Sequence, residues 1–266
     1  LESMCHPDEQ ICFFNDAAFC IAADPVLIKE YAFKLGIVGN NLKDFTVHNV
    51  ESGYTKVYDN GASLFFNHAE ISPNFQPGHA HADSLSFELS LGEKRVLVNS
   101  GTSTYVNDST RDYERSTSAH NTVVVDNKNS TEVWGGFRVA RRAKIFSVNH
   151  KNQDVTAMCR HVNGALHCRS ISLNNGVFIS DTITHKGGEL YAFFHFHPDC
   201  TVHRISVNSW NVLVENYNLV VSFSSDESSL ISSFWRPQFG LKIISQSLKV
   251  KFNGNLDTEM TWLINE

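Results

Sequence analysis

Residues Gly78–Asp126 read GHAHADSLSFELSLGEKRVLVNSGTSTYVNDSTRDYERSTSAHNTVVVD. At the start of this stretch His79, His81 and Asp83 lie two residues apart, and the apolar residues that follow continue the same alternation. Successive side chains of a strand point to opposite faces, so a strand reaching back to position 79 places these polar groups on the apolar face. Polar groups on a covered face need partners, which we expect to be a metal ion, one another or a substrate.

A plainer interpretation of the two histidines is a pair that is hydrogen-bonded within a loop. Three further features favour a functional site: Asn99 after an apolar run, Tyr105 beyond it, and His120 at the head of another apolar run. The loop 101–119 between them is polar and rich in serine and threonine. Loops of this length in compact domains are often functional.

The motifs GHAHADSLSFEL, VLVNSGTSTY and RSTSAHNTVVVD resemble, in this order, the core signature of the heparinase II/III-like polysaccharide lyases. The resemblance extends from about Cys12 to the C-terminus. It implies a β-sandwich that follows an upstream α-toroid domain of the same protein. It also implies a carbon-oxygen lyase, periplasmic or secreted, that cleaves a uronate-containing acidic polysaccharide of the heparin/heparan, alginate or a related type by β-elimination.

The resemblance implies a role for each polar residue of the three motifs. His79 is expected at the active site, and His81, Asn99 and His120 are expected to bind a metal, usually Zn²⁺, with Asp83 as the alternative source of the oxygen ligand. Asn99 stands where the family carries an aspartate. A neutral amide oxygen is a weaker zinc ligand than a carboxylate, so we expect zinc binding to be weakened.

The long loop offers further groups that a β-elimination needs. The C5 proton must be removed, the uronate carboxylate neutralised and the leaving oxygen protonated. A tyrosine can act as acid or base when a nearby cation lowers its pKa, which makes Tyr105 a catalytic candidate. An arginine can clamp a carboxylate, so Arg111 and Arg115 are predicted to bind substrate. Alternatively, both arginines brace the loop through salt bridges to acidic neighbours, namely Asp108, Asp112 and Glu114.

Composition restricts the class of protein. The chain has 266 residues, of which 42% are hydrophobic and 19% charged, as in globular domains. Its formal net charge is −6, so a general attraction to nucleic acid is not expected. No run of about twenty apolar residues is present, so no membrane span is expected. One basic stretch, Arg138–Lys144, is a candidate for contact with a polyanion or is a solvated strand face.

The first part of the chain differs from the rest. Residues 25–35 predict a short helix, with Asp24 at the N-cap and Gly36 as the stop signal. We assign residues 1–45 to the helical tail or linker of the upstream toroid that the resemblance implies. The opening LESMCHPDEQ is expected to lie inside a longer protein.

From about residue 46 the pattern changes to short strands separated by turn signals, of which Asp59-Asn60-Gly61 is the strongest. No helix-length periodic segment interrupts them. The predicted fold of residues 46–266 is therefore all-β, a multi-stranded antiparallel β-sandwich with a short helical segment before it.

One geometric requirement follows from the hairpin expected between residues 85–91 and 95–99. Asn99 would lie opposite residues 86–88, whereas His81 is some 15–20 Å further along a straight strand at about 3.3 Å per residue. Both can bind one metal only if the chain bends sharply between about 78 and 84; otherwise the pairing of these strands is not a simple hairpin.

Two functions remain open. The first is the lyase. The second is a non-catalytic glycan-binding or structural β-sandwich that supports a separate catalytic domain. A catalytic residue set supplied wholly by this chain would favour the first.

Overall fold

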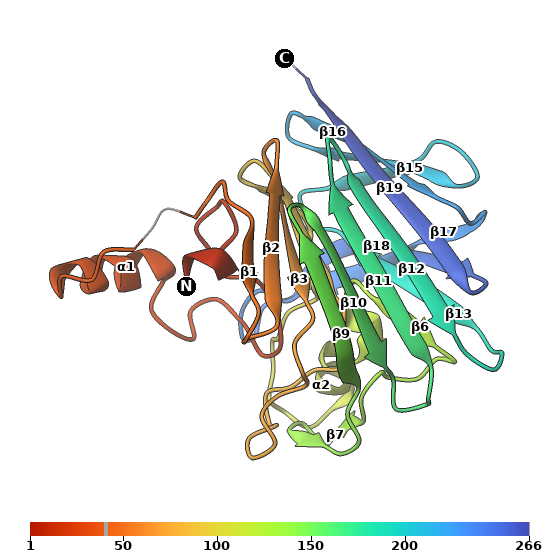
Figure 1. The fold of residues 1–266 in the computed structure, drawn as a ribbon, viewed down its shortest axis with the longest axis horizontal. Helices are drawn as coiled ribbons and strands as arrows, with labels where there is room; N and C mark the ends of the chain where they lie inside the picture. The colour runs from red at the N-terminus through yellow and green to blue at the C-terminus, as the bar shows by residue number, and fades with distance from the viewer. Residues whose placement is uncertain (40–41, 266) are drawn as a thin grey trace.

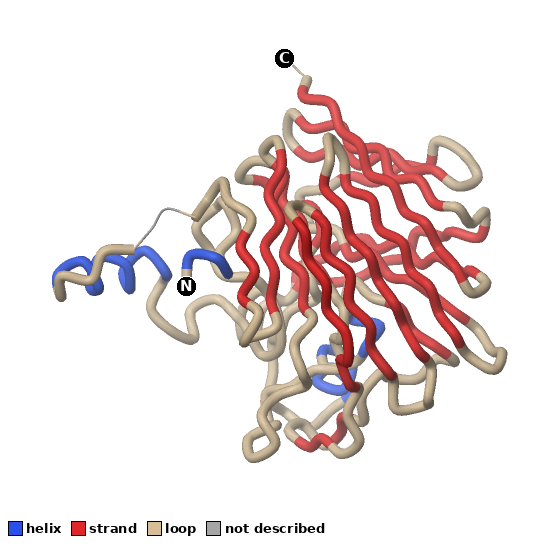
Figure 2. The backbone as a smooth tube through the Cα atoms, viewed as in Figure 1, coloured by secondary structure: helices blue, strands red, loops and turns tan. Residues whose placement is uncertain are grey.

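The computed structural model describes residues 1–39 and 42–265. Figure 1 shows long strands stacked in layers, with α1 projecting from one side and α2 at one end of the strands. Strands dominate and helices are short and few (Figure 2). The predicted all-β antiparallel sandwich is confirmed. Within the described ranges, no helix is long and apolar enough to cross a membrane.

The helical elements of the described chain are η1 (Glu2–Met4), α1 (Pro25–Lys34), α2 (Ser109–Glu114) and η2 (Thr117–Ala119). The first strands are β1 (Val47–Asn49), β2 (Tyr54–Asp59), β3 (Ala62–Asn67), β4 (Phe87–Leu91), β5 (Lys94–Leu97), β6 (Val123–Val125), β7 (Val133–Trp134), β8 (Arg138–Val139), β9 (Lys144–Lys151) and β10 (Asp154–Arg160). The later strands are β11 (Leu166–Leu173), β12 (Val177–Thr184), β13 (Leu190–His195), β14 (Thr201–Arg204), β15 (Ser209–Val214), β16 (Tyr217–Phe223), β17 (Glu227–Trp235), β18 (Ile243–Phe252) and β19 (Asn255–Ile264).

The strands form sheets in the orders β1-β2-β3-β4-β5, β14-β15-β16-β19-β12-β11-β10-β9, β17-β18-β13-β6 and β7-β8. Backbone hydrogen bonds join the end of β5 in the five-stranded sheet to the end of β13 in the four-stranded sheet, since Val98 N donates to His195 O (2.9 Å) and His197 N to Val96 O (2.9 Å). Apolar side chains of these two sheets and of the eight-stranded sheet form one buried cluster. That cluster is the core of the sandwich.

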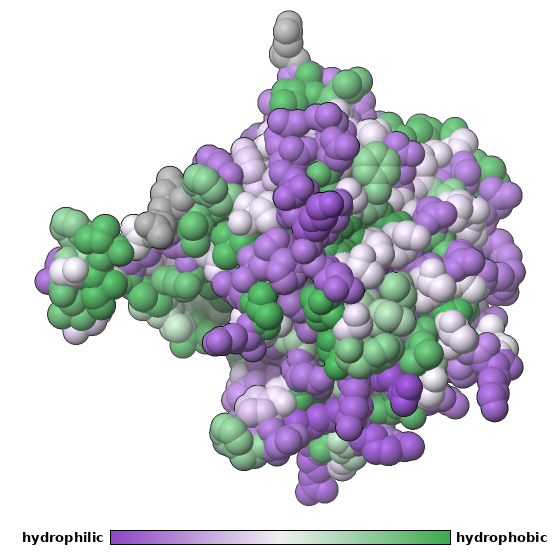
Figure 3. All heavy atoms as spheres, in the orientation of Figure 1, coloured by the Kyte–Doolittle hydropathy of each residue, from purple (hydrophilic) through white to green (hydrophobic). Residues whose placement is uncertain are grey.

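Helix α1 begins and ends close to its predicted signals. Pro25 occupies the first helical position, and Gly36 follows the helix with a positive φ of 75°. Its apolar residues do not pack on the sandwich: Leu27, Tyr31 and Phe33 are 55%, 63% and 74% exposed. Figure 3 shows apolar surface gathered on this projection.

The β-hairpins follow their turn signals. Asn60 and Gly61, with φ of 44° and 80°, connect β2 to β3. Strand β4 pairs with β5, but β4 begins at Phe87 and does not reach back to position 79 as expected. Before it the chain turns, because Ser86 N donates to Asp83 O (3.0 Å) and Leu85 has a positive φ of 58°.

The polar side chains that alternate with the apolar ones along β4 are buried rather than solvated. Glu88 is fully buried because the N-terminal segment covers it. His6 Nε2 lies 2.9 Å from Glu88 Oε2, and Phe13 N donates to the same oxygen (3.0 Å). Part of the segment before position 46 therefore packs against the sandwich.

Candidate active site

The bend before β4 brings together two of the predicted histidines. His81 Nδ1 lies 3.1 Å from His120 Nε2, although the residues are 39 positions apart. The bend is held against the following loop, because Ala82 N donates to Arg115 O (2.9 Å) and Thr117 Oγ1 donates to Ala82 O (2.8 Å). The sharp turn that the sequence required for a shared site is therefore present.

Asp16 is the centre of the site, and the sequence analysis missed it. Its side chain is 4% exposed. Its Oδ1 lies 2.8 Å from His81 Nε2, and its Oδ2 lies 2.9 Å from His79 Nδ1. Both terminal nitrogens of Arg111 also donate to this carboxylate, with Nη2 2.8 Å from Oδ2. No local pattern around Asp16 signals this role, since its partners lie 63 to 95 residues away.

The charge states of the site follow from these contacts. Burial alone would raise the pKa of Asp16, but hydrogen bonds from His81 and Arg111 outweigh it and hold that pKa well below its usual range. Burial lowers the pKa of His81 and, more strongly, of His120. The site therefore combines an ionised carboxylate with two neutral, buried imidazoles.

His79 and Tyr105 form the solvent-facing part of the site. The His79 side chain is 58% exposed. The Tyr105 hydroxyl lies 3.5 Å from His79 Nδ1, which is longer than the contact of that nitrogen with Asp16. Burial, followed by the negative charge of Asp16, raises the pKa of Tyr105. The charge of Arg111 acts to lower this pKa but is outweighed, so the phenol keeps its proton at neutral pH.

Arg111 and Arg115 are at most 1% exposed and bind protein atoms instead of facing a cleft. Arg111 Nε donates to Gly136 O (3.0 Å) in addition to its contacts with Asp16. Arg115 Nε donates to Ala80 O (3.0 Å). Both arginines brace the loop, as the alternative interpretation predicted. Their partners, however, are not the acidic neighbours that this interpretation named. The structure does not support direct contact between either guanidinium and substrate.

Asn99 is also fully buried and hydrogen-bonded. Its Oδ1 accepts from Asn121 N (3.1 Å), and its Nδ2 donates to Phe13 O (3.0 Å). Its amide therefore holds the residue next to His120. No described contact joins Asn99 directly to His81 or His120.

The basic stretch Arg138–Lys144 is partly occupied by structural contacts. Arg141 forms an exposed ion pair with Glu132. Arg142 Nη1 donates to two carbonyls of the preceding loop, those of Ile71 and Ser72 (3.0 Å each). Only part of this stretch is free to meet a polyanion.

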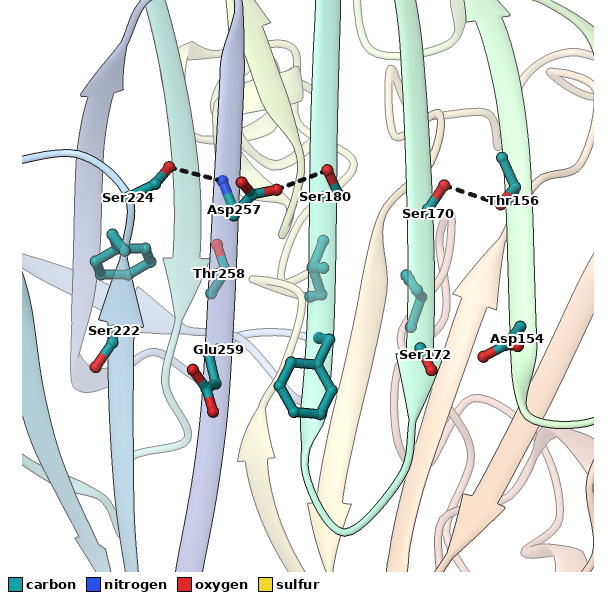
Figure 4. A pocket seen from close by; sticks show the side chains of 14 residues that line it. Asp154, Thr156, Ser170, Ser172, Ser180, Ser222, Ser224, Asp257, Thr258 and Glu259 are labelled. Atoms are coloured by element: carbon teal, nitrogen blue, oxygen red, sulfur yellow. Dashed lines mark hydrogen bonds between the residues drawn. The ribbon is translucent and has the colours of Figure 1, made fainter.

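A separate hollow of 670 Å³ lies on the outer face of the eight-stranded sheet. Figure 4 shows its carboxylates (Asp154, Asp257, Glu259) among serine and threonine hydroxyls. No lysine or arginine lines it, and none of the predicted site residues belongs to it. We place the candidate active site instead at His79, Tyr105 and Asp16, whose side chains contact one another.

Residues 46–263 match the family model described as Heparinase II/III-like, C-terminal. The chain belongs to this family. The resemblance read from the three motifs is therefore confirmed for this heparinase II/III-like domain. No match was found among curated proteins.

Solved structures share the fold of this heparinase II/III-like chain at low sequence identity. A heparinase III gene product aligns with a TM-score of 0.79 and 14% identity over 99% of this chain and 45% of its own. The heparan sulfate lyase HepC from Pedobacter heparinus aligns with a TM-score of 0.74 and 16% identity, covering 99% of this chain and 45% of its own. The present chain thus spans less than half the length of these proteins.

Proposed function

We propose that this domain forms one wall of the active site of a polysaccharide lyase that cleaves a uronate-containing acidic polysaccharide by β-elimination. One observation carries the proposal. His79 is a solvent-facing imidazole whose Nδ1 is held by the buried, ionised Asp16, beside the protonated Tyr105. A carboxylate that holds Nδ1–H fixes the tautomer and leaves the Nε2 lone pair free to act as a base.

The residues support a balanced elimination. His79 Nε2 takes the C5 proton, and the electron pair of the C5–H bond forms the C4–C5 double bond as the C4–O bond breaks. Tyr105 gives its phenolic proton to the leaving oxygen, a role that suits a phenol with a raised pKa. The products are an unsaturated uronate and a free hydroxyl, and the proton on His79 returns to Tyr105 through solvent.

The uronate carboxylate still needs a neutralising group. Arg111 and Arg115 are buried and bonded to protein atoms, so we propose that this group comes from an opposite wall, an upstream α-toroid domain of the same protein. The solved neighbours are long enough to include such a domain, because this chain covers only 45% of their length. The exposed apolar side chains of α1 offer a contact surface for it (Figure 3).

The burial of Arg111 and Arg115 also favours a second candidate function. If no cation of this chain meets the substrate carboxylate, residues 1–266 alone form a non-catalytic module that supports chemistry supplied elsewhere. The two functions differ in one measurable property, which is whether the longer protein is a lyase.

We expect residues 1–266 alone to show little or no lyase activity and the longer protein to be active. Positioning of the sugar against the base contributes up to roughly 7–11 kcal/mol of an enzyme's acceleration, and half a cleft cannot supply it. The assay follows the ultraviolet absorbance of unsaturated uronate on alginate, heparan sulfate, chondroitin sulfate and hyaluronan. Robust turnover by the isolated chain, abolished by His79→Ala, would show that the site is complete without a second wall. An inactive longer protein would favour the module.

The histidine pair fits a metal ion. His81 Nε2–H donates to Asp16, and His120 Nδ1–H donates to Ser116 O (2.8 Å). The lone pairs of His81 Nδ1 and His120 Nε2 therefore face each other across 3.1 Å, with no hydrogen between them. Two imidazoles on one tetrahedral Zn²⁺ with bonds of about 2.05 Å place their nitrogens about 3.3 Å apart. Hydrogen-bond acceptors on the far nitrogens are the usual support of such ligands.

We therefore propose that His81 and His120 bind Zn²⁺, with Asn99 as a third, weaker ligand. The Asn99 oxygen already accepts one hydrogen bond and has a second lone pair. When bound, the ion supplies a fixed positive charge close to the catalytic wall.

Zinc analysis of purified protein tests this site. We expect His81→Ala to lose most of the bound zinc because half of the imidazole pair is gone, whereas His203→Ala, an exposed histidine on β14, keeps it. Asn99→Asp should tighten binding because a carboxylate is a better ligand than an amide. Equal zinc contents in His81→Ala and the parent would rule the site out.

We extend the proposal to location, in the periplasm or outside the cell, because a polymeric polysaccharide does not cross a membrane unaided. Fractionation of cells that express the natural protein tests this. Recovery only with the cytosol would contradict it.

A further inference from the structure

A basic pocket lies on the four-stranded sheet, beside the turn that joins β17 to β18. Its volume is 500 Å³, and its lining includes Arg236, Lys242 and Lys249 without any carboxylate. Such a concentration of positive charge is unusual in a chain whose formal net charge is −6. The pocket lies apart from the contacts of His79, Asp16 and Tyr105 described above.

Arg236 forms the buried side of this pocket. It is 5% exposed, and its Nη1 donates to Phe234 O (3.2 Å). Its Nε lies 3.4 Å from Glu114 Oε1 but makes no hydrogen bond within the described chain. That carboxylate oxygen instead accepts from Ser103 N (3.0 Å). The Arg236 guanidinium is thus balanced in charge by Glu114, whose Oε2 also lacks a hydrogen bond within the described chain. This ion pair by itself leaves the positive charge of the two lysines uncompensated.

Two lysines add positive charge without an ion pair within 4.0 Å among the described residues, although Glu189 attracts Lys249 over a longer distance. Lys242 Nζ lies 3.6 Å from the centroid of the Phe234 ring, and Lys249 Nζ lies 3.7 Å from that of Tyr191. Aromatic faces hold an ammonium group without neutralising it. Lys251 on the same strand shows the ordinary case, since its Nζ approaches carboxylate oxygens of two glutamates at 3.8 Å.

The turn between β17 and β18 connects this pocket to the candidate active site. The ring of Phe239, in that turn, lies 4.7 Å from the ring of Tyr105, centroid to centroid. Gly240 N donates to Ser103 O (2.9 Å), two residues before Tyr105. The turn therefore lies against Tyr105 on one side and joins the segments that carry Arg236 and Lys242.

We propose that this basic pocket is a distal subsite for an anionic group, a sulfate or a carboxylate, of the glycan whose reacting residue meets His79 and Tyr105. The inference rests on the proposed function. A guanidinium or an ammonium group each matches the oxygens of such a group. The two ammonium groups lie toward opposite ends of the pocket, since Lys242 Nζ lies over Phe234 and Lys249 Nζ over Tyr191. The hollow of Figure 4 differs from this basic pocket in charge. Its charged lining residues are all carboxylates, which would repel the same ligand.

The test is calorimetric binding of size-fractionated oligosaccharides to the His79→Ala protein, so that turnover does not interfere. The double variant Lys242→Gln/Lys249→Gln is compared with Lys151→Gln/Lys186→Gln, which removes two exposed lysines elsewhere. We expect the Kd of a hexasaccharide to rise roughly tenfold in the first variant and less than about twofold in the control. The Kd of a disaccharide, which is too short to reach the pocket, should not change. Thermal unfolding of both variants checks that the fold is intact.

Three arms separate the possible ligands. Sulfated heparin-type fragments, unsulfated uronate fragments and inorganic sulfate are tested in parallel. A lysine-dependent loss with sulfated fragments alone identifies a sulfate subsite, and a loss with both kinds of fragment identifies a general anion subsite. Equal hexasaccharide affinity in the two lysine variants overturns the proposal. So does lysine-dependent binding of inorganic sulfate without any fragment binding, which would mark an adventitious ion only.

The outcome is distinguishable from failure of the proposed function. If the longer protein cleaves no uronate polymer but the lysine-dependent binding is found, the subsite stands and the lyase assignment falls. If cleavage is found and the two lysine variants bind alike, the lyase assignment stands and the subsite falls.

Discussion

Replacing His79 by alanine in a protein that joins this domain to the proposed toroid is expected to lower kcat on the proposed uronate substrate by about 10²–10⁴-fold, the usual contribution of a positioned general base. The physical reason is specific to this imidazole. Asp16 holds Nδ1 at 2.9 Å, which leaves Nε2 as the proton acceptor on the exposed side. Alanine removes the acceptor, and water cannot occupy the same place with the same orientation.

Tyr105→Phe is the corresponding variant for the proposed general acid. It removes the hydroxyl and keeps the ring, which packs on Phe137 and Phe239 at 5.0 and 4.7 Å between centroids. We expect a loss of kcat of about 10²-fold or more with little change in thermal stability.

Steady-state kinetics with His203→Ala as the control measures both losses. Activity of His79→Ala or Tyr105→Phe within about threefold of the parent would remove that residue from the mechanism, because general acid–base catalysis contributes far more.

The largest expected effect on stability is at a buried charge cluster that links the eight-stranded sheet to the site. Asp181 accepts from Arg169 Nε (2.7 Å) and Nη2 (2.9 Å), and His167 Nε2 lies 2.7 Å from Asp181 Oδ1. Arg169 Nη1 also donates to Leu85 O (2.6 Å) and Asn121 O (2.8 Å), in the two loops that carry the site histidines. Asp181→Asn leaves Arg169 buried without its counter-charge, so we expect a loss of about 3–5 kcal/mol in unfolding free energy.

Urea unfolding measures this loss, with Asp154→Asn, an exposed aspartate on β10, as the control. The double variant Arg169→Met/Asp181→Leu removes both charges and is expected to recover only part of the loss, because the carbonyls of Leu85 and Asn121 lose their donor. A change below about 0.5 kcal/mol in Asp181→Asn, typical of surface positions, would show that the cluster does not support the fold.

The pH dependence of the unfolding free energy also reports on the contribution of Asp181. Burial would raise the pKa of Asp181, but the charge of Arg169 and the hydrogen bond from His167 hold it well below its usual range. A carboxyl whose folded pKa is depressed stabilises the protein fully above its unfolded pKa of about 3.9 and loses that contribution as pH falls below it. The unfolding free energy of the parent should therefore fall more steeply below about pH 4 than that of Asp181→Asn. Parallel curves would contradict this assignment.

The sequence by itself determined the class of fold, the turns and the family. Strand alternation, the Asn60-Gly61 turn and the β4–β5 hairpin are local features, set by backbone periodicity and by the few residues that tolerate a positive φ. The motif order identified the heparinase II/III-like family. Strand geometry showed that a metal shared by His81 and Asn99 needs either a bend before β4 or another strand pairing.

Only the tertiary structure decided which groups meet. Asp16 reaches His81 and Arg111 across 65 and 95 residues, and it leaves Arg111 bonded inside the protein instead of facing substrate. Asn99 is likewise occupied by the backbone of Asn121. Hydrogen-bond partners so far apart depend on how the layers pack and on which segment covers each buried polar group. Alternation and turn signals reach only a few residues along the chain, so they specify the strands but not these contacts.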